Sequence, residues 1–194
     1  MTALALALAT TIKHDGHGGI ADLLSTEAEA VAWLAGQQHL LAPVLGAFDV
    51  PSAELHRGLI GMRRAVRALF ARAVAPNPPS KADADRLLDV ESALRMVNEA
   101  ADRLGAPTLE WPADSAPGLR WTFRTEDPLE LLLGAIGRST IDFLVSPDRA
   151  RLRACPAARC VKYFLQDDPR QTWCTPACGN RERVNRHYRK RTAG

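Results

Sequence analysis

The residues with the clearest chemical potential are the chain's four cysteines. They form two closely spaced pairs, Cys155-x4-Cys160 and Cys174-x3-Cys178. Two such pairs separated by a loop are the usual way in which one short segment supplies four sulfur ligands to a tetrahedral Zn²⁺ ion. Because four thiolates close the coordination shell and leave no position for a substrate or a water molecule, the spacing predicts a structural zinc site and not a catalytic one.

An even number of cysteines is also compatible with two disulfides in an exported protein. The apolar N-terminal residues lack the basic start and the layout of a signal peptide. No apolar run approaches the roughly 20 residues that a membrane span requires. We therefore expect a cytoplasmic protein without a membrane partner, in which clustered thiols favour a metal. Iron–sulfur ligation and a redox thiol switch are the alternatives. His187 could replace one ligand, but four cysteines already fill the shell.

Charge is distributed unevenly along the chain. Residues 148–194 hold 12 Lys and Arg against 4 Asp and Glu, a net charge of +8. Since the whole chain carries +3, residues 1–147 carry −5. A weakly acidic body followed by a basic segment is typical of a regulatory or scaffold domain joined to a nucleic-acid-binding element. A basic helix that is simply solvated is the alternative reading.

A helix is expected to begin within the second cysteine pair, between Cys174 and Cys178. Thr175 and Pro176 are typical N-cap and N1 residues, which places Cys178 in the first turn. Such a helix start also stabilises thiolates through its dipole. Two short strands, residues 152–155 and 162–165, are expected to flank the first cysteine pair. A hairpin followed by a ligand-bearing helix would form a treble-clef-like zinc finger.

Basic side chains of this terminal helix gather on one face. At 100° per residue, Arg183, Arg186 and Lys190 lie roughly above one another. Arg189 and Arg191 lie at the edges of the same face. Guanidinium and ammonium groups arranged in this way suit the phosphates or a groove of a nucleic acid.

The other side chains of the terminal helix have different expected roles. Asn180 and Asn185 carry carboxamides that can read base edges. Val184 and Tyr188 lie one turn apart on roughly the opposite face from the basic residues. We expect this apolar pair to pack on the cysteine knuckle.

The first 147 residues are mostly helical in pattern. Thr26 and Glu29 form a capping box that opens one helix. A longer helix is expected from about Ser52, because apolar residues follow at alternating steps of four and three: Leu55, Leu59, Met62, Val66, Leu69 and Ala73. The arginines off this stripe are expected on a solvated face, or around a pocket for an acidic ligand: Arg57, Arg63, Arg64, Arg67 and Arg72.

A second long helix is expected to pack against the first. The proline-rich run 76–79 breaks the first helix, Ser80 is expected to cap the second, and Gly105 to end it. Its apolar stripe comprises Leu87, Val90, Leu94, Val97, Ala101 and Leu104. Two antiparallel helices packed along these stripes would form the centre of the body.

The pattern then changes to short alternating segments. Residues 108–111 and 119–123 flank a turn-rich stretch and predict a small β-hairpin, whose tryptophans are expected to cover the helical core. An aromatic ligand cage is the alternative. Asp127-Pro128 then predicts the start of a last helix, which ends before Ser146-Pro147. This break gives two expected domains, residues 1–147 and 148–194.

The C-terminal segment resembles a known zinc finger. Residues 174–181 read Cys-Thr-Pro-Ala-Cys-Gly-Asn-Arg, and with Arg183 and His187-Tyr188-Arg189 they are similar to the CGNR zinc finger. In that family the finger follows a mostly helical domain called ABATE, in proteins regarded as stress-induced bacterial transcription regulators. Residues 22–26 with Trp33-Leu34 are similar to the start of that domain. The resemblance implies that Cys155, Cys160, Cys174 and Cys178 are the zinc ligands and that Arg181 is the motif arginine.

These observations combine into one expectation. The fold should be mainly α with a small β-hairpin, a helical N-terminal domain being followed by a treble-clef-like zinc finger. The function should be that of a DNA-binding transcription regulator with bound Zn²⁺, contacting DNA through the terminal helix: Asn180, Arg181, Arg183, Arg186, Arg189, Lys190 and Arg191. The helical domain would bind a small-molecule effector or form a homodimer.

Two other functions are compatible with the same residues. The finger could be purely structural in a small-molecule-binding protein, or the partner could be RNA. A deep pocket lined by His, Arg or Trp would favour ligand binding, and a flat apolar patch would favour dimerisation. An enzyme is not expected, because the sequence shows no nucleophile elbow, phosphate loop or HExxH pattern.

Overall fold

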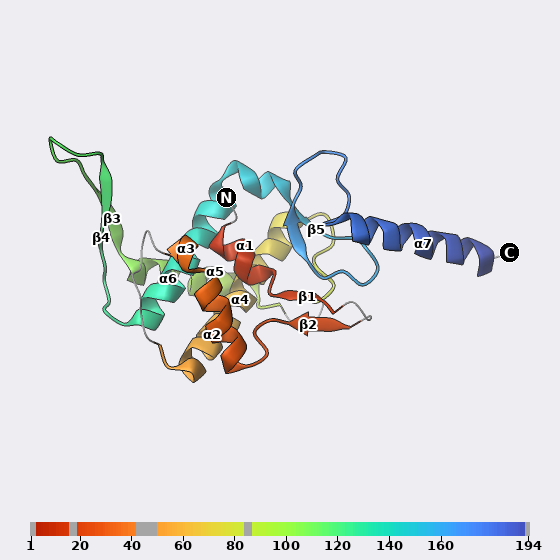
Figure 1. Cartoon of the computed structure of the whole chain (residues 1–194), viewed down its shortest axis with the longest axis horizontal. Coiled ribbons are helices and arrows are strands. Elements are labelled where there is room, and N and C mark those ends of the chain that lie inside the picture. The colour runs from red at the N-terminus through yellow and green to blue at the C-terminus, as the bar shows by residue number, and fades with distance from the viewer. Residues whose placement is uncertain (1–2, 16–18, 42–49, 84–86, 193–194) are drawn as a thin grey trace.

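The computed structural model describes residues 3–15, 19–41, 50–83 and 87–192, and its overall arrangement is shown in Figure 1. The α-helices are α1 (Leu4–Ala9), α2 (Glu27–Gly36), α3 (Gln38–Leu41), α4 (Ser52–Val74), α5 (Val90–Leu104), α6 (Pro128–Val145) and α7 (Pro176–Thr192). A 3-10 helix, η1, spans Pro147–Arg151. The antiparallel strand pairs are β1 (Ile12–His14) with β2 (Ile20–Asp22), β3 (Ala106–Glu110) with β4 (Gly118–Thr122), and β5 (Leu152–Ala154) with β6 (Tyr163–Leu165). The mainly helical fold is the one that the sequence predicts, as are the strand pairs β3–β4 and β5–β6, whereas the pair β1–β2 is not predicted.

Helix α4 is the centre of the body and contacts α1, α2, α5, α6 and β5. The predicted stripe along it is buried from Leu55 to Leu69. The predicted capping box of α2 is also present. The Thr26 side chain accepts from the Glu29 backbone, and the Glu29 carboxylate accepts from the Thr26 backbone. None of the helices in the described part of the chain combines the length and the hydrophobicity of a membrane span.

Helices α5 and α6 pack at unusually short range. A Cβ atom placed on Gly137 would lie 2.8 Å from the Val97 carbonyl oxygen, and one on Gly134 would lie 2.8 Å from Leu104 Cβ. Any larger residue at these positions would force the helices apart. The two glycines therefore set the distance between α5 and α6.

The start of α5 differs from the prediction. The helix begins at Val90 and is capped by Asp89, whose side chain accepts from the Ser92 backbone at 2.8 Å. Ser80 does not cap it. Ser80 is buried and its hydroxyl donates to the carbonyl oxygen of Val161 at 2.8 Å. The predicted stripe is also wrong at Leu94, which is 45% exposed.

The prediction that the arginines of α4 are solvated is wrong for two of them. Arg63 and Arg67 are only 5% and 2% exposed. Arg63 donates to both carboxylate oxygens of Asp22, at 2.5 and 2.7 Å. Burial opposes the ionisation of Asp22, but the hydrogen bonds from Arg63 and from the Leu24 backbone outweigh it and lower the Asp22 pKa.

Arg67 lies deeper than Arg63 and has more partners. It donates to Asp83 at 2.7 Å, to the Ala9 carbonyl at 2.5 Å and to the Ser80 hydroxyl at 2.9 Å. A buried guanidinium is tolerated only when it is paired and hydrogen-bonded in this way. Arg57, Arg64 and Arg72 are exposed as predicted.

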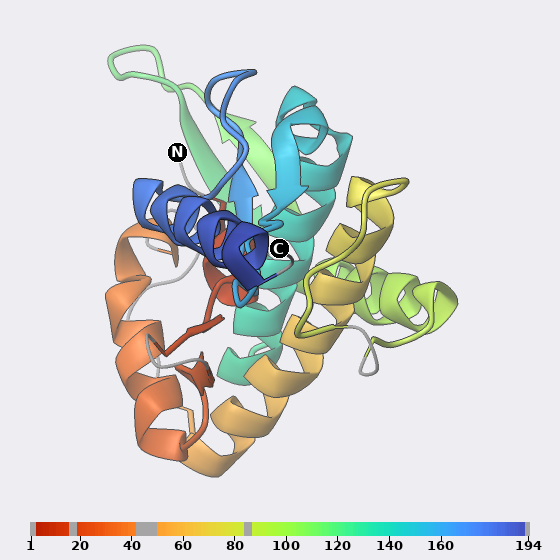
Figure 2. The same ribbon diagram turned by 90° about the vertical axis from the view of Figure 1, so that its right-hand side faces the viewer.

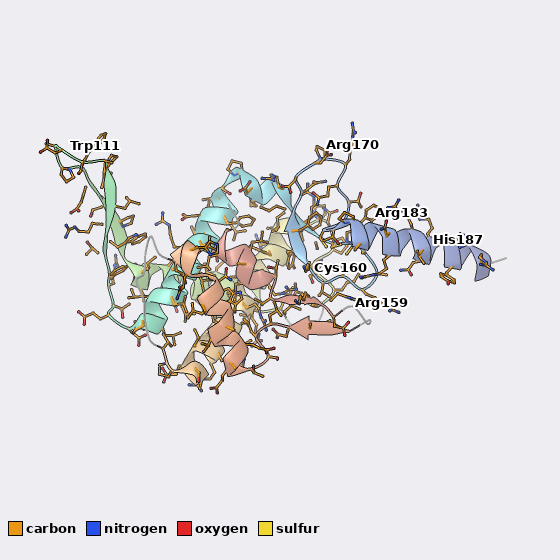
Figure 3. The ribbon with its side chains drawn as sticks, viewed as in Figure 1. Trp111, Arg159, Cys160, Arg170, Arg183 and His187 are labelled. Atoms are coloured by element: carbon orange, nitrogen blue, oxygen red, sulfur yellow. The ribbon has the colours of Figure 1, made fainter. Side chains whose placement is uncertain are left out.

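The predicted hairpin forms, but it does not cover the core. Strands β3 and β4 project from the end of the body opposite α7 (Figure 1). Trp111 lies on this projection and is 69% exposed (Figure 3). Trp121 of β4 instead stacks on Phe123, which directly follows that strand, with ring centroids 6.3 Å apart. The expectation that both tryptophans cover the helices is therefore wrong.

The C-terminal strand pair packs directly on the helices (Figure 2). Leu152 of β5 and Tyr163 of β6 are both 1% exposed and belong to the same hydrophobic core as α4 and α6. The Tyr163 ring meets Phe70 edge-on, with centroids 5.6 Å apart. The helical body and the strands β5 and β6 thus share one core.

The close approach of α5 and α6 can be tested with Gly137→Ala. The added methyl should destabilise the protein by about 1–3 kcal/mol through overpacking. Gly61→Ala in α4 is the matched control, because a Cβ there meets no atom within 4 Å. The control should be neutral or stabilising by up to about 1 kcal/mol, since alanine favours the helix. Urea unfolding of both variants measures the difference, and equal stabilities would contradict the tight crossing.

Candidate metal centre and basic helix

The hairpin β5–β6 shapes the first cysteine pair. Between its strands the chain folds into a knuckle, residues 155–160, closed by a hydrogen bond from the Cys160 backbone to the Ala157 carbonyl at 2.9 Å. The Cys155 backbone donates to the Lys162 carbonyl at 3.0 Å and extends the ladder by one step. This geometry directs both sulfurs toward the start of α7.

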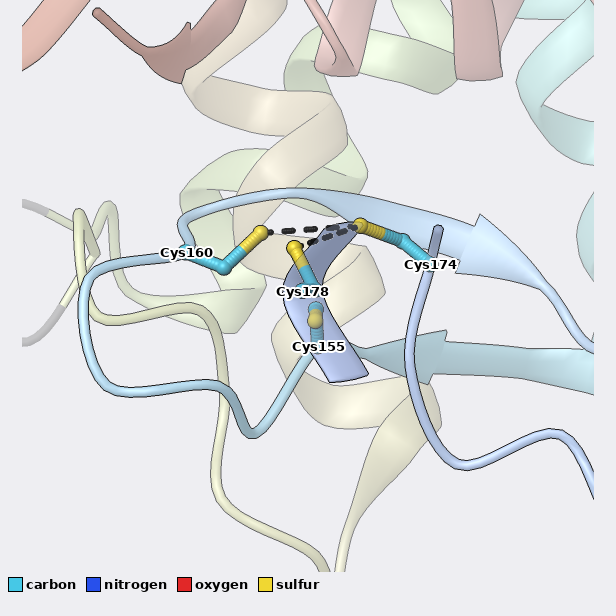
Figure 4. Close-up of side chains that lie close together, drawn as sticks. All are labelled: Cys155, Cys160, Cys174 and Cys178. Atoms are coloured by element: carbon cyan, nitrogen blue, oxygen red, sulfur yellow. Dashed lines mark hydrogen bonds between the residues drawn. The ribbon is translucent and has the colours of Figure 1, made fainter. Parts of the chain in front are cut away.

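Helix α7 supplies the fourth sulfur, as predicted. Thr175 caps the helix, since its hydroxyl accepts from the Cys178 backbone at 3.3 Å. Cys178 therefore lies in the first turn, where the helix dipole favours a thiolate. Cys174 precedes the cap in the loop that leads from β6 (Figure 4).

The four sulfur atoms converge on one point (Figure 4). All of them lie within 4.8 Å of one another. The Cys174 sulfur is 3.6 Å from that of Cys160 and 3.6 Å from that of Cys178. A tetrahedral ion with metal–sulfur bonds of about 2.3 Å places its ligands about 3.8 Å apart, whereas a disulfide requires about 2.05 Å. The sulfurs are thus spaced as metal ligands, and all four cysteines are free of disulfides.

The electrostatics of the cluster also favour a cation. Hydrogen bonds from the Cys160 and Cys174 thiols hold the pKa of Cys155 far below its ordinary value. The interaction with Cys155 in turn raises the pKa of Cys160 and of Cys174. Without a positive charge, ionisation of Cys155 makes ionisation of Cys160 and Cys174 less favourable, because like charges in one buried site repel. A divalent cation removes this conflict and allows all four thiolates to form.

Side chains that the sequence reasoning missed surround the cluster. A Cβ on Gly179 would lie 3.1 Å from the Trp173 ring, so the glycine lets the indole cover the helix start. Glu182 accepts from the Ala158 backbone at 2.6 Å and fixes α7 to the knuckle. The aromatic residue before Cys174 and the glycine after Cys178 are the only local signals of this packing.

Beyond Glu182, α7 extends away from the body (Figures 1 and 3). Arg183, Arg186 and Arg191 are exposed as predicted. His187 is also exposed, more than two turns beyond Cys178, and does not join the sulfurs. Val184 and Tyr188 are 53% and 63% exposed, so the prediction that they pack on the knuckle is wrong.

The remaining residues predicted to contact nucleic acid differ in their environment. Asn180 is exposed, and its side-chain oxygen accepts from Arg183 at 2.5 Å. Arg181 is half-buried, and its Nη1 has no hydrogen-bond partner among the described residues. The side chains of Arg189 and Lys190 lie outside what the structure describes.

Comparison with known families agrees with this geometry. Residues 2–147 match the ABATE family model, which is described as "Putative stress-induced transcription regulator". The chain belongs to the ABATE family. Residues 151–191 match the model of the CGNR zinc finger, which contains all four converging cysteines. A comparison with curated proteins found no match.

The ABATE domain holds the CGNR finger through polar contacts, of which those of Tyr163 are buried. Tyr163 of the finger donates to Asp83 at 2.7 Å, and the Arg67 guanidinium lies 5.1 Å from the centre of the Tyr163 ring. Burial, and secondarily the charge of Asp83, raises the pKa of Tyr163, so the phenol remains a donor. Lys81 donates to the knuckle carbonyls of Pro156 at 2.9 Å and Ala157 at 2.5 Å.

The metal site can be tested with Cys178→Ser. Loss of one thiolate from a closed four-sulfur shell should reduce bound metal from one ion per chain to a small fraction, because affinity depends on the complete ligand set. Arg159→Ala is the control, since this exposed residue lies in the same knuckle and carries no ligand. Elemental analysis of both purified variants measures the ratio and separates zinc from iron. Full metal content in Cys178→Ser would contradict the assignment.

Proposed function

We propose that this protein is a zinc-containing DNA-binding regulator whose CGNR finger presents α7 to the DNA backbone. One observation carries the proposal: α7 leaves the body as an exposed helix, and after Glu182 its charged residues are all basic. The described side chains along its last turns are exposed, so core packing does not account for so many positive charges. A polyanion gives them a role.

Zinc in this account is structural. The four residues that would hold it are Cys155, Cys160, Cys174 and Cys178, and together they leave no open coordination position. When bound, the ion would offset half of the negative charge of the four thiolates and would fix the start of α7 against the knuckle. Cysteines that form no disulfides suit a reducing compartment, so we propose that the protein is cytoplasmic. We also propose that it acts by binding and not by catalysis.

Contacts to phosphate are better supported than contacts to bases. The Asn180 carboxamide is engaged by Arg183, and the Asn185 amide donates to Glu182 at 3.4 Å. Both carboxamides would have to change partners before reading a base edge. Phosphate contacts position a protein without specifying sequence, so one finger alone would discriminate weakly. We propose that a homodimer supplies sequence specificity by placing two fingers on adjacent half-sites.

The proposal predicts a measurable dependence on salt. A protein that neutralises about three phosphates should show a slope of about −2.7 in a plot of log affinity against log salt concentration. Arg183→Ala with Arg186→Ala should flatten this slope by about 1.8, since each lost phosphate contact removes about 0.9. Fluorescence anisotropy with a short DNA duplex over a salt series measures both values.

The control removes the same charge from the helical body. Arg57→Ala with Arg95→Ala changes two exposed arginines of α4 and α5. This variant should keep the wild-type slope. The proposal fails if affinity for the duplex does not depend on salt, or if both double variants behave alike. If an RNA of the same length bound more tightly than the duplex, the partner of α7 would be RNA and not DNA.

A further inference from the structure

A large cavity lies in the ABATE domain next to the finger. Its volume is about 610 Å³, within the usual range for small-molecule sites. Helix α4, the strand pair β1–β2 and the segment after the proline-rich run contribute its walls. No role for this cavity follows from the metal centre or from α7.

One part of the cavity wall is aliphatic. Ile12 and Ile20 come from the strand pair, Ile60 from α4 and Leu87 from the segment before α5. Ile20 is 55% exposed, which is costly for a large apolar side chain unless a partner covers it. This wall suits a short hydrocarbon chain better than a sugar or an inorganic ion.

The charged part of the wall is positive overall. Arg63, Arg64, Arg67 and Lys81 line it, against Asp22 and Asp83. Each carboxylate is already paired with a buried arginine, Asp22 with Arg63 and Asp83 with Arg67. Among the described residues that line the cavity, no carboxylate is therefore left to neutralise the two remaining cations, Arg64 and Lys81.

The two cations differ in what they contact. Lys81 donates to backbone carbonyls of the knuckle. Arg64 forms no ion pair with any carboxylate in the described part of the chain. It is exposed, lies on α4 beside Arg63 and borders the cavity. Arg64 is thus placed to bind an anion without first breaking an internal ion pair.

We propose that this cavity binds a small aliphatic carboxylate, with its hydrocarbon chain on the aliphatic part of the wall and its carboxylate on Arg64. The guanidinium offers two parallel N–H donors to a carboxylate. The excess of positive charge repels metal cations and amines. An inorganic anion would leave the aliphatic wall uncovered.

The same cavity is connected to the finger. Arg67 and Ser80 both donate to the carbonyl of Val161, at 3.4 and 2.8 Å, and Val161 directly follows the ligand Cys160. Lys81 holds the other half of the knuckle through Pro156 and Ala157. A carboxylate bound to Arg64 would place a negative charge in the cavity that Arg67 and Lys81 also line, and it would attract these two cations away from the knuckle carbonyls. Occupancy therefore changes how firmly the finger is held, and an effect on DNA rests on the function proposed above.

The binding site is tested by calorimetric titration of the zinc-loaded full chain with hexanoate. Hexanoate should bind, and its neutral analogue hexanamide should bind at least about tenfold more weakly, because a charge-assisted contact is lost. Arg64→Ala should weaken hexanoate binding by a similar factor. Arg72→Ala, an exposed arginine of the same helix outside the cavity, should leave it unchanged.

Three results would overturn the site: no binding of hexanoate at tens of millimolar, equal binding of hexanoate and hexanamide, or equal loss in Arg64→Ala and Arg72→Ala. The connection to the finger has its own readout, the rate of zinc transfer to a colorimetric chelator. Hexanoate should change that rate at least twofold in the wild type and not in Arg64→Ala. An unchanged rate at saturating hexanoate would overturn the connection. Neither measurement involves DNA, so failure here is distinguishable from failure of the proposed function.

Discussion

The arrangement of the C-terminal segment depends on a conflict between four sulfur atoms that share one small buried site. The interaction with Cys155 raises the pKa of Cys160 and of Cys174, so these thiols resist ionisation unless a cation is bound. The finger's own buried cluster is small and consists largely of the cysteines themselves, with Ala157 and Phe164. A core of this size cannot stabilise a fold unaided, so the ion would supply much of its folding free energy. Through Cys178 that ion would set the direction of α7, and Glu182 fixes the same part of the helix to the knuckle by a direct hydrogen bond.

A second constraint fixes the finger to the helical body. The buried pair of Arg67 and Asp83 is surrounded by partners from three parts of the chain, including Tyr163 of the finger. Buried ion pairs contribute little net stability when compared with apolar packing of the same volume. They do enforce one geometry, since any shift leaves a charge unpaired in the interior. A metal held by the cysteines would thus orient α7 relative to the knuckle, and the ion pair orients the knuckle relative to the body.

Local signals in the sequence were sufficient for much of this structure. The cap residues Thr26, Asp127 and Thr175 predicted helix starts, and the cysteine spacing predicted the sulfur cluster. The errors concern residues whose partners are distant in sequence. Arg63 and Arg67 look solvated on a helical wheel, but α4 is surrounded by other elements from Met62 to Phe70, with Arg64 alone exposed. The carboxylates that compensate them come from β2 and from the segment before α5.

Apolar residues at the two ends of the molecule show the converse limit. Trp111, Val184 and Tyr188 have the spacing of core-facing residues, but the elements that carry them extend beyond the core. Spacing reports which side chains share a face, and not whether another element lies opposite that face. Ser80 shows the same limit for polar residues, since a serine after a proline-rich run is a normal helix cap, and only the fold places the Val161 carbonyl beside it.

The central claim, that one ion held by four sulfurs orients the basic helix, is tested most directly by X-ray absorption at the zinc edge on the purified full-length protein. The account predicts a shell of four sulfur atoms at about 2.3 Å. A shell containing nitrogen or oxygen ligands, or a metal-free protein whose finger remains folded, would contradict it.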